Sequence, residues 1–333
     1  MTVLTSSIST KVVNCPVCET PCSDPPLYHY TATEAAQFFC PKTRSVERNQ
    51  RLESAIQKLW DGSDCDILRC PDCQFAFAYP FVGGDEEFYS ILHEQKGYPS
   101  WRWDYDIAIR EAMTSFPKGK VLDIGAGAGM FLQGLDDNWL CYAVEGSELT
   151  RKPLESAGIK VFRDLSQAAQ SEAGSFQVIT LFQVLEHISE FRQVLDPCRQ
   201  LLAKGGRLVI TVPDGEAMIR QEKLTGCPDM PPNHVNKWTP DSLSRALLEA
   251  GFTPNLPIFE PPSWRNFTSS LYLRVLTDAT NPNSLAAQVY RIPNKKVRIP
   301  LLALLGISAI PRLLPSLHKL RDGGSFAMIG IVN

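Results

Sequence analysis

The chain has 333 residues, of which 44% are hydrophobic and 21% charged, and its 33 Lys and Arg nearly balance its 36 Asp and Glu. This apolar content can fill a large core, which excludes a wholly disordered chain, and the net charge of −3 excludes a general attraction to nucleic acid or to an anionic membrane. Residues 1–14 lack the apolar run of a signal peptide, and the sequence has no uninterrupted apolar run of membrane-spanning length. We therefore expect a cytoplasmic protein.

Residues 1–80 contain most of the cysteines and are predicted to form a small metal-binding module. Cys15-Pro16-Val17-Cys18 and Cys70-Pro71-Asp72-Cys73 are two Cys-Pro-x-Cys knuckles, and a two-residue spacer allows both thiolates of a knuckle to bind one tetrahedral Zn²⁺. We predict a structural zinc held by Cys15, Cys18, Cys70 and Cys73, with a long insertion between the knuckles. A redox pair or plain buried cysteines are the alternatives, and three other cysteines could replace a ligand: Cys22, Cys40 and Cys65.

Residues 81–117 are predicted to form an aromatic linker that ends in a helix over 107–116, closed by Pro117. Four of the aromatic side chains in this linker either cover a cofactor or form an ordinary packing cluster. They are Tyr98, Trp101, Trp103 and Tyr105.

From residue 118 to about residue 258, short apolar runs alternate with helical patterns. This alternation predicts a parallel sheet with helices on both faces. Thr239-Pro240 predicts the start of a further helix that continues to about Ala250. The expected strands are 120–124, 139–144, 159–162, 176–181 and 207–212, and the expected helices between them are 130–136, 148–157, 165–171 and 191–202.

A glycine-rich loop follows the first expected strand, with the sequence D-I-G-A-G-A-G-M over residues 123–130. Glycines permit a tight turn close to a ligand, and the helix that follows offers free N–H groups. A dinucleotide-binding loop would have glycine in place of Met130, and Asp123 would repel a pyrophosphate but attract an ammonium group. The loop therefore favours a cationic ligand without phosphate, and it argues against a dehydrogenase.

This loop resembles motif I of the class I S-adenosylmethionine-dependent methyltransferases, D/E-x-G-x-G-x-G, and further matches follow in order. Glu145 ends the second strand, where the acidic residue of the family binds the ribose hydroxyls. Asp164 falls where the family contacts the adenine, although it is equally suited to cap a helix. Residues 176–188 and 201–213 resemble the fourth-strand motif and the turn into strand five. The resemblance implies these cofactor-binding residues: Asp123, Gly125, Gly127, Gly129, Glu145, Asp164 and Phe182.

The resemblance covers about residues 118–258 and the last strand, and it implies an α/β fold. We expect a Rossmann-like seven-stranded sheet of order 3-2-1-4-5-7-6, with the last-formed strand antiparallel, behind a zinc-ribbon-like module. The expected divisions are 1–80, 81–117 and 118–333, with an apolar and basic insertion over 259–324. Together with the Cys-Pro-x-Cys pair, the pattern resembles small-molecule methyltransferases (methyltransferase type 11/12), several of which act on sugar nucleotides, glycans or lipid-linked intermediates.

Two histidines are candidates for the general base that methyl transfer to a hydroxyl or amine requires. His187 lies directly after the fourth strand, and His234 lies on the loop after the fifth strand, where an acceptor is expected. The alternative for His187 is a structural role, in which it caps the next helix or pairs with Glu186.

The insertion contains an apolar stretch, Ile299–Leu317, which three prolines make too broken to span a membrane. Seven basic residues flank or interrupt it: Arg291, Lys295, Lys296, Arg298, Arg312, Lys319 and Arg321. The stretch either covers the acceptor pocket or contacts anionic lipid at a membrane surface through residues 291–321.

We therefore expect a methyltransferase that uses S-adenosylmethionine and a small-molecule acceptor. The alternatives are a ribosomal-RNA methyltransferase with a zinc module and a non-catalytic protein that binds the cofactor. The loop after strand four, Leu181–Val184, lacks the Asn-Pro-Pro-Phe/Tyr pattern of base-modifying enzymes, and the net charge is negative, so no nucleic-acid partner is expected. The sequence leaves the acceptor and the oligomeric state open.

Overall fold

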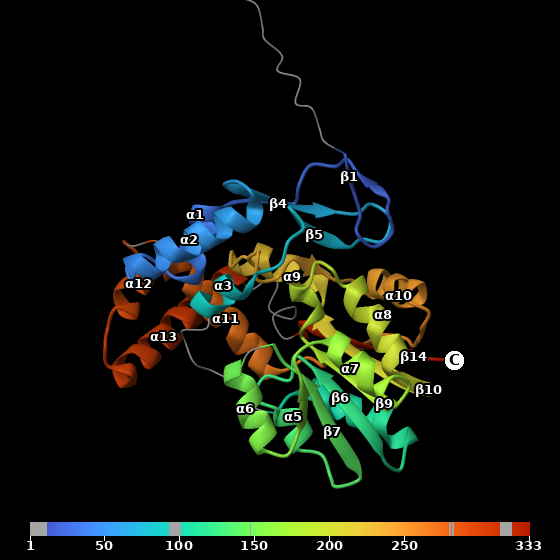
Figure 1. Cartoon of the computed structure of the whole chain (residues 1–333). Coiled ribbons are helices and arrows are strands. Elements are labelled where there is room, and N and C mark those ends of the chain that lie inside the picture. The colour runs from blue at the N-terminus through green and yellow to red at the C-terminus, as the bar shows by residue number, and fades with distance from the viewer. Residues whose placement is uncertain (1–11, 93–100, 147, 280, 282, 314–321) are drawn as a thin grey trace, which may run out of the picture.

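A large, mostly parallel sheet forms the centre of the molecule (Figure 1). The computed structural model describes residues 12–92, 101–146, 148–279, 281, 283–313 and 322–333. The sheet has the order β12-β14-β10-β9-β6-β7-β8, with β13 paired to β14 off this path. Its strands are β6 (Gly119–Ile124), β7 (Trp139–Val144), β8 (Lys160–Phe162), β9 (Phe176–Phe182), β10 (Leu202–Pro213), β12 (Thr253–Pro254), β13 (Ile258–Phe259) and β14 (Ser325–Ile331).

This order confirms the predicted 3-2-1-4-5-7-6 arrangement when β6 is counted as the first strand and β14 as the last. β10 pairs with β9 in parallel and with β14 in antiparallel orientation, as expected. Because the carboxyl ends of β6, β7 and β9 lie at one edge, residues that follow these strands share that edge.

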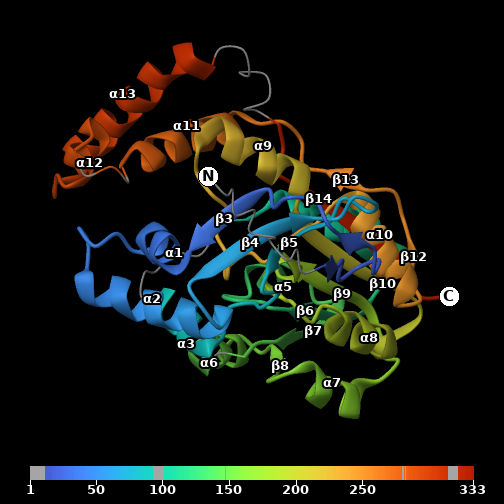
Figure 2. The same cartoon turned by 90° about the horizontal axis from the view of Figure 1, so that it is seen from above.

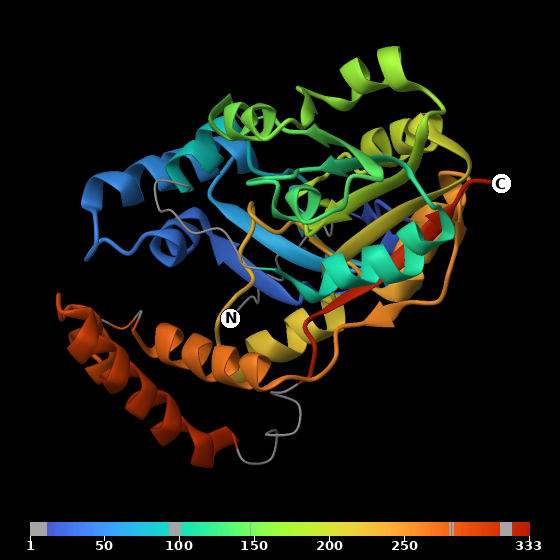
Figure 3. The ribbon, with the colours of Figure 1, turned by 90° about the horizontal axis from the view of Figure 1, so that it is seen from below.

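Helices cover both faces of the sheet (Figure 3), and the strand residues alternate between the two cores. Val121 and Val178 pack with α4, α5 and α6, whereas their neighbours Leu122 and Ile179 pack with α7, α8 and α10. The helices are α4 (Trp103–Ile107), α5 (Met130–Gln133), α6 (Glu148–Ser156), α7 (Leu165–Glu172), α8 (Arg192–Leu201), α9 (Gly215–Thr225) and α10 (Pro240–Glu249).

Two predicted helices have other bounds in the structure. The helix expected over 107–116 begins earlier, as α4, and continues through a π-helical turn, η1 (Ala108–Ala112), into a 3-10 turn, η2 (Met113–Ser115). Helix α5 ends at Gln133, directly before Gly134. By contrast, α10 begins as predicted, because the Thr239 side chain accepts a hydrogen bond from Ser242 N.

The N-terminal part contains a second sheet, of order β11-β5-β4-β3. Its fourth strand, β11, comes from the segment after α9, and Asn236 pairs with Phe77 of β5. The N-terminal module and the larger domain therefore share one sheet. The elements of this part are β1 (Val13–Asn14), β2 (Pro21–Cys22), β3 (Tyr28–Thr31), α1 (Ala32–Phe39), α2 (Val46–Trp60), β4 (Asp64–Arg69), β5 (Ala76–Tyr79), α3 (Glu86–Leu92) and β11 (Asn236–Lys237).

In the described residues of the insertion before β14, three helices lie along one side of the molecule (Figures 1 and 2). They are α11 (Trp264–Ala279), α12 (Leu285–Tyr290) and α13 (Lys295–Leu313). Helix α13 continues through Pro300 and Pro311, which the sequence interpretation treated as breaks. Within the described residues, none of the helices combines the length and the apolar character needed to cross a membrane.

Candidate functional site

The glycine loop between β6 and α5 requires glycine at three positions. Gly125, Gly127 and Gly129 have φ values of +74°, +54° and +72°, in the left-handed region that other residues rarely adopt. A Cβ atom at Gly125 would lie 2.8 Å from Val184 Cγ2, and one at Gly129 would overlap the Leu154 side chain. The backbone of the loop is thus close to its neighbours on one side, as expected where a ligand approaches it on the other.

Glu145 follows β7, the strand beside β6, and its carboxylate reaches the glycine loop. Oε2 of Glu145 accepts a hydrogen bond from Gly127 N at 3.1 Å. A carboxylate accepts hydrogen bonds only, which suits it to the paired hydroxyl donors of a ribose. The structure therefore brings together two of the predicted cofactor contacts, the loop and the acid.

Asp123 is buried at the end of β6, where Thr180 Oγ1 donates a hydrogen bond to Oδ1 at 2.8 Å. Desolvation raises the pKa of Asp123 to about 7. A nearby cation would favour the ionised form of this carboxyl group, so the position fits a ligand with a positive charge.

Phe182 ends β9 within an aromatic cluster. Its ring centroid lies 4.8 Å from that of Phe131 and 4.9 Å from that of Tyr105, whose ring packs against Trp101 at 5.2 Å. Of the linker aromatics, Trp101 and Tyr105 thus belong to one packing cluster with Phe182, and their contact with a cofactor stays a prediction. Tyr98 lies outside the described residues.

Two charged residues of the linker belong to this region and were missed from the sequence. Asp104 is fully buried and accepts hydrogen bonds from Thr211 Oγ1 at 2.9 Å and from Arg102 Nε at 3.0 Å. Because the contact with Thr211 joins residues more than 100 positions apart, no local motif could have indicated it.

Asp164 lies at the start of α7, and its Oδ1 accepts a hydrogen bond from Gln167 N at 2.8 Å. This is the helix cap that was the alternative to a contact with adenine. The predicted cofactor role of Asp164 stays a prediction.

The two Cys-Pro-x-Cys knuckles meet in space. The Sγ atoms of Cys15, Cys18, Cys70 and Cys73 all lie within 4.8 Å of one another, and three of the pairs are separated by 3.4–3.6 Å. A tetrahedral Zn²⁺ with Zn–S bonds of about 2.3 Å would place its sulfur ligands about 3.8 Å apart. The four thiols therefore fit a zinc ion, with no fifth cysteine in the group.

Contacts fasten both knuckles to the larger domain. Arg192 Nη2 donates to Val17 O at 3.0 Å, and Thr239 Oγ1 donates to Cys73 O at 3.0 Å. Since Thr239 also caps α10, the second knuckle and that helix are held by one side chain. A metal at the knuckles would stabilise this junction.

His187 and His234 come together although they follow different strands. Their ring centroids lie 4.7 Å apart, and the side chains of both lie within 4.8 Å of the Glu186 carboxylate. Nδ1 of His187 donates to Asn233 O at 2.7 Å, and Nε2 lies 3.9 Å from Glu186 Oε1. The pairing with Glu186 that was the structural alternative for His187 is therefore present as well.

His234 has a partner, Asp229, that was missed from the sequence, and Asp229 in turn pairs with Lys237. Nδ1 of His234 donates to Asp229 Oδ1 at 2.6 Å, and Lys237 Nζ lies 3.0 Å from Asp229 Oδ2. Desolvation would raise the pKa of Asp229, but the charges of His234 and Lys237 outweigh it and hold this pKa below its ordinary value. Desolvation alone would lower the pKa of His234, and the interaction with Asp229 raises it instead. Asp229 lies five positions before His234, so this pair had a local signal.

Glu186 lies behind the two histidines in the 3-10 turn η3 (Leu185–His187). It is buried, desolvation raises its pKa to about 7, and its Oε2 has no hydrogen-bond partner among the described residues. A buried polar atom without a partner is costly, which marks this position as one that a ligand or a proton would satisfy.

One turn connects the histidines to the glycine loop. Gln183 leaves β9 with φ +56°, and Val184 then packs against Gly125 just before Glu186 and His187. On the other side, Val235 N donates to Glu186 O at 3.0 Å. The expected cofactor loop and the expected acceptor side are thus held by opposite sides of one short segment.

Comparison with known proteins identifies the domain. Residues 103–255 match a family model described as a methyltransferase domain. Several curated relatives are named ubiquinone biosynthesis O-methyltransferase. That of Psychrobacter arcticus is 27% identical over 40% of this chain and 59% of its own length, and that of Nitrosococcus oceani is 31% identical over 27% and 41%. The chain thus spans about half the length of these two relatives.

A solved methyltransferase from Archaeoglobus fulgidus, described as S-adenosylmethionine-dependent, is 18% identical to this chain. The similarity covers 73% of this chain and 99% of that protein, with a TM-score of 0.44. The strand order, the glycine loop with its acid and the family match lead to one conclusion. The chain contains a class I S-adenosylmethionine-dependent methyltransferase domain.

Proposed function

We propose that the protein transfers a methyl group from S-adenosylmethionine to a hydroxyl group of a small-molecule acceptor. The observation that carries the proposal is the short segment 183–187, which packs against the glycine loop at Gly125 and presents His187 beside His234. Bound S-adenosylmethionine would supply an activated sulfonium methyl group. The protein would then hold the acceptor and remove its proton.

The residues proposed to hold the cofactor are those around the glycine loop. Gly125, Gly127 and Gly129 would bring backbone N–H groups close to the ligand, and Glu145 would accept from the ribose hydroxyls. Asp123 would face the cationic end of the ligand, and Asp164 and Phe182 would lie toward the adenine. The conformations of the glycines and the bond from Gly127 N to Glu145 support this arrangement.

The acceptor is proposed to be a small molecule of the sugar-nucleotide, glycan or lipid-linked class, and not a nucleic acid. The name shared by the curated relatives supports oxygen as the atom that is methylated. A histidine with a carboxylate on its Nδ1, as in His234 and Asp229, is a suitable base for a hydroxyl group.

The module over 1–80 is proposed to bind one structural Zn²⁺ through Cys15, Cys18, Cys70 and Cys73. Four thiolates would leave no open coordination position, so the metal would stabilise the module and take no part in the reaction. We expect metal analysis to find about one zinc per chain and Cys70→Ser to lose it. The matched control is Cys22→Ser, a buried cysteine outside the group of four, which should retain the metal. Zinc that persists in Cys70→Ser would contradict the ligand set.

The cytoplasm is the proposed location, because a cluster of four metal-binding thiols is typical of a reducing compartment. Contact with a membrane surface is proposed for the segment 291–321, of which 314–321 lies outside the described residues. The exposed side of α13 supports this contact, since Val297, Ile299, Leu304 and Ile307 are each at least 48% exposed. Basic residues at its start include Lys295 and Lys296.

The experiment that tests the proposed function uses the full chain, methyl-labelled S-adenosylmethionine and a total extract of metabolites and lipids from bacterial cells. Mass spectrometry would search for a labelled product, and calorimetry would measure cofactor binding. We expect cofactor binding and a labelled product whose formation is lost in Glu145→Ala. Cofactor binding without any labelled product would overturn methyl transfer in favour of a non-catalytic binding protein, and absence of both would overturn the cofactor assignment as well.

A further inference from the structure

A cavity of about 280 Å³ lies where the N-terminal module and the larger domain meet the insertion. Phe38 of α1 lines it from the N-terminal module, Pro213 and Met218 line it from the end of β10 and from α9, and Leu273 of α11 lines it from the insertion. Its volume is close to the lower end of the range for small-molecule sites. The cavity thus exists only because all three parts of the chain surround it.

The cavity adjoins the carboxyl edge of the large sheet. Pro213 is the last residue of β10, and β10 is the neighbour of β9. Gln183 N donates to Thr211 O at 2.9 Å, so the turn that packs against the glycine loop is also tied to the end of β10. A molecule in the cavity would therefore lie on the side of the cofactor loop where an acceptor is needed.

The polar side of the cavity is formed by His234 and Asp229. Their side chains keep 23% and 24% of their surface exposed, so they are accessible from the cavity although their mutual hydrogen bond is 2.6 Å long. Because a carboxylate only accepts hydrogen bonds, Nδ1 of His234 carries the proton that is donated to Asp229. Nε2 is then the basic atom of the neutral imidazole.

Other polar contacts hold this pair in place. Lys237 Nζ donates to Asp229 O at 3.2 Å in addition to its ion pair with the Asp229 carboxylate. Lys237 itself belongs to β11, which is fixed to β5 of the N-terminal sheet. The N-terminal module therefore determines where His234 lies.

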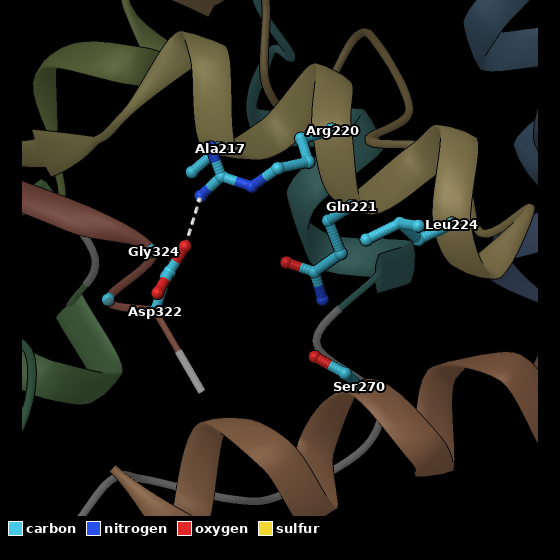
Figure 4. Close-up of a pocket in the computed structure, with 8 residues that line it drawn as sticks. Ala217, Arg220, Gln221, Leu224, Ser270, Asp322 and Gly324 are labelled. Carbon is cyan, nitrogen blue, oxygen red and sulfur yellow. Dashed lines mark ion pairs between the residues drawn. The ribbon is translucent and has the colours of Figure 1, made fainter. Parts of the chain in front are cut away.

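A small groove between α9 and α11 lies beside the cavity (Figure 4). Gln221 and Ser270 point into it from the two helices, and Arg220 forms an ion pair of 3.7 Å with Asp322 at its other side. Gln221 and Gly324 line both the groove and the cavity, so the two spaces are adjacent. The groove itself, at about 20 Å³, has room for about one water molecule, so the cavity is the space that could hold a small molecule.

We propose that this composite cavity is the acceptor site, that His234 is the general base positioned by Asp229, and that the acceptor combines an apolar body with a hydroxyl group. The inference rests on the proposed methyltransferase function and deepens it. The hydroxyl oxygen forms a bond to the methyl carbon, the carbon–sulfur bond breaks with its electrons remaining on sulfur, and the hydroxyl proton moves to Nε2 of His234. His187 lies beside His234, and its Nδ1 donates to Asn233 O. His187 is therefore not the proposed base.

The first test measures the rate of labelled product from the extract with methyl-labelled S-adenosylmethionine. Loss of a general base lowers such rates by about 100-fold or more. We expect this loss in His234→Gln with unchanged cofactor affinity, and less than a tenfold loss in His187→Gln. A rate in His234→Gln within threefold of the wild type would overturn the assignment. Absence of product from the wild type would overturn the proposed function instead.

The second test fills the cavity. Leu273→Trp should raise the KM for the extracted acceptor at least tenfold, because the larger side chain takes volume from the site. The matched control is Leu285→Trp on the same insertion, where Leu285 is 67% exposed and outside the cavity. Equal KM values in the two variants would contradict the placement of the acceptor.

The third test needs no acceptor. Nuclear magnetic resonance of labelled histidine should show that the pKa of His234 lies above its ordinary value and falls in Asp229→Asn. The titratable groups that interact with His234 are Asp229, Lys237 and Glu186, with His187 beside it and Cys227 in the lining of the same cavity, and the comparison changes only Asp229. In activity, the acidic limb of the rate profile should move to lower pH in the same variant. A limb and a pKa that do not move would remove the positioning role of Asp229.

Discussion

Glu145 has two expected partners, and substitutions can separate them. Its carboxylate accepts from Gly127 N at 3.1 Å and would also accept from the ribose of the cofactor. Glu145→Gln keeps one acceptor oxygen, whereas Glu145→Ala keeps none. A hydrogen bond to a charged group contributes about 1.5–3 kcal/mol, or about a 10- to 100-fold change in affinity. We expect calorimetry to give a Kd about tenfold higher in the first variant and about 100-fold higher in the second.

Glu148 provides the control for this prediction. It lies on the adjacent helix α6 and pairs with Lys152 on the surface, so Glu148→Gln removes the same charge without a contact to the loop. Its Kd should equal that of the wild type. If the Glu145 and Glu148 variants bind the cofactor equally well, Glu145 is not a cofactor ligand.

Asp123 predicts a pH dependence of cofactor affinity. Its pKa of about 7 lies above the ordinary value, so below pH 7 the free protein holds a proton that a cationic ligand would have to displace. Affinity should therefore rise with pH, by up to about tenfold per unit below pH 7, and level off above it. Calorimetry at pH 5.5, 6.5 and 7.5 measures this trend, and Asp123→Asn should weaken it. An identical slope in that variant would assign the dependence to another group.

The raised pKa of Asp123 also affects the stability of the protein without cofactor. A carboxyl group whose pKa is higher in the folded than in the unfolded chain favours folding most at low pH, and this contribution is lost as pH rises through about 4 to 7. Bound cofactor would reverse this loss at Asp123, because a cation favours the ionised form.

At the scale of the elements, the segment that links β5 to α3 packs directly against the turn η3 at Gly83. A Cβ atom at Gly83 would overlap the carbonyl oxygen of His187. We expect Gly83→Ala to lower the free energy of unfolding by about 1–3 kcal/mol through overpacking, and to slow methyl transfer by shifting His187 and its neighbour His234. Urea unfolding and the rate of labelled product measure the two effects.

Gly62 is the matched control, because the nearest atom to a Cβ at this position lies 3.9 Å away. Gly62→Ala should change stability by less than about 0.5 kcal/mol and leave the rate unchanged. A Gly83→Ala protein that matches Gly62→Ala in both measurements would show that the linker does not position the turn.

Most elements with a local sequence signal were predicted, but two helices, α1 and α13, were not. Six strands of the large sheet were found because each is a short apolar run between turns, whereas the two-residue strands β12 and β13 were not predicted. Helix α1 was overlooked although Thr31 and Glu34 form a capping box at its start, which is visible in the sequence. Helix α13 was not expected as one helix because of Pro300 and Pro311. Both prolines are exposed, so carbonyl groups that lose a helical partner can be solvated.

At the scale of the whole molecule, the glycine loop with its acid was predictable and the composite cavity was not. Asp123 and Glu145 lie within ordered motifs, whereas the cavity depends on Phe38 and Leu273, which are more than 200 residues apart. Likewise, the pairing of β11 with β5 leaves no periodic pattern in either segment. Long-range pairing of this kind depends on how the completed parts fit together, which local propensity does not determine.

Phe38, Met218 and Leu273 line the cavity from the three parts of the chain, and α13 packs against α11 at the edge of the molecule (Figure 2). Helix α13 is apolar on its exposed side, and the sequence from 284 to 313 contains several basic residues and no acidic residue. An apolar surface with a basic border matches the headgroup region of an anionic bilayer. An acceptor with an apolar body would then reach the cavity from the membrane along the insertion.

Co-sedimentation with vesicles tests this arrangement. We expect the full chain to bind vesicles that contain phosphatidylglycerol, to bind pure phosphatidylcholine at least tenfold more weakly, and to be released by 0.5 M salt, at which charges are screened within a few ångströms. The double variant Lys295→Glu/Lys296→Glu should lose most of the binding. Lys118→Glu/Lys204→Glu makes the same change at exposed sites on the large domain and should bind like the wild type. If the two double variants bind equally, α13 is not the contact surface. If the apolar face of α13 instead joins two copies of the chain, sedimentation velocity will show a dimer, and Leu304→Ser will dissociate it.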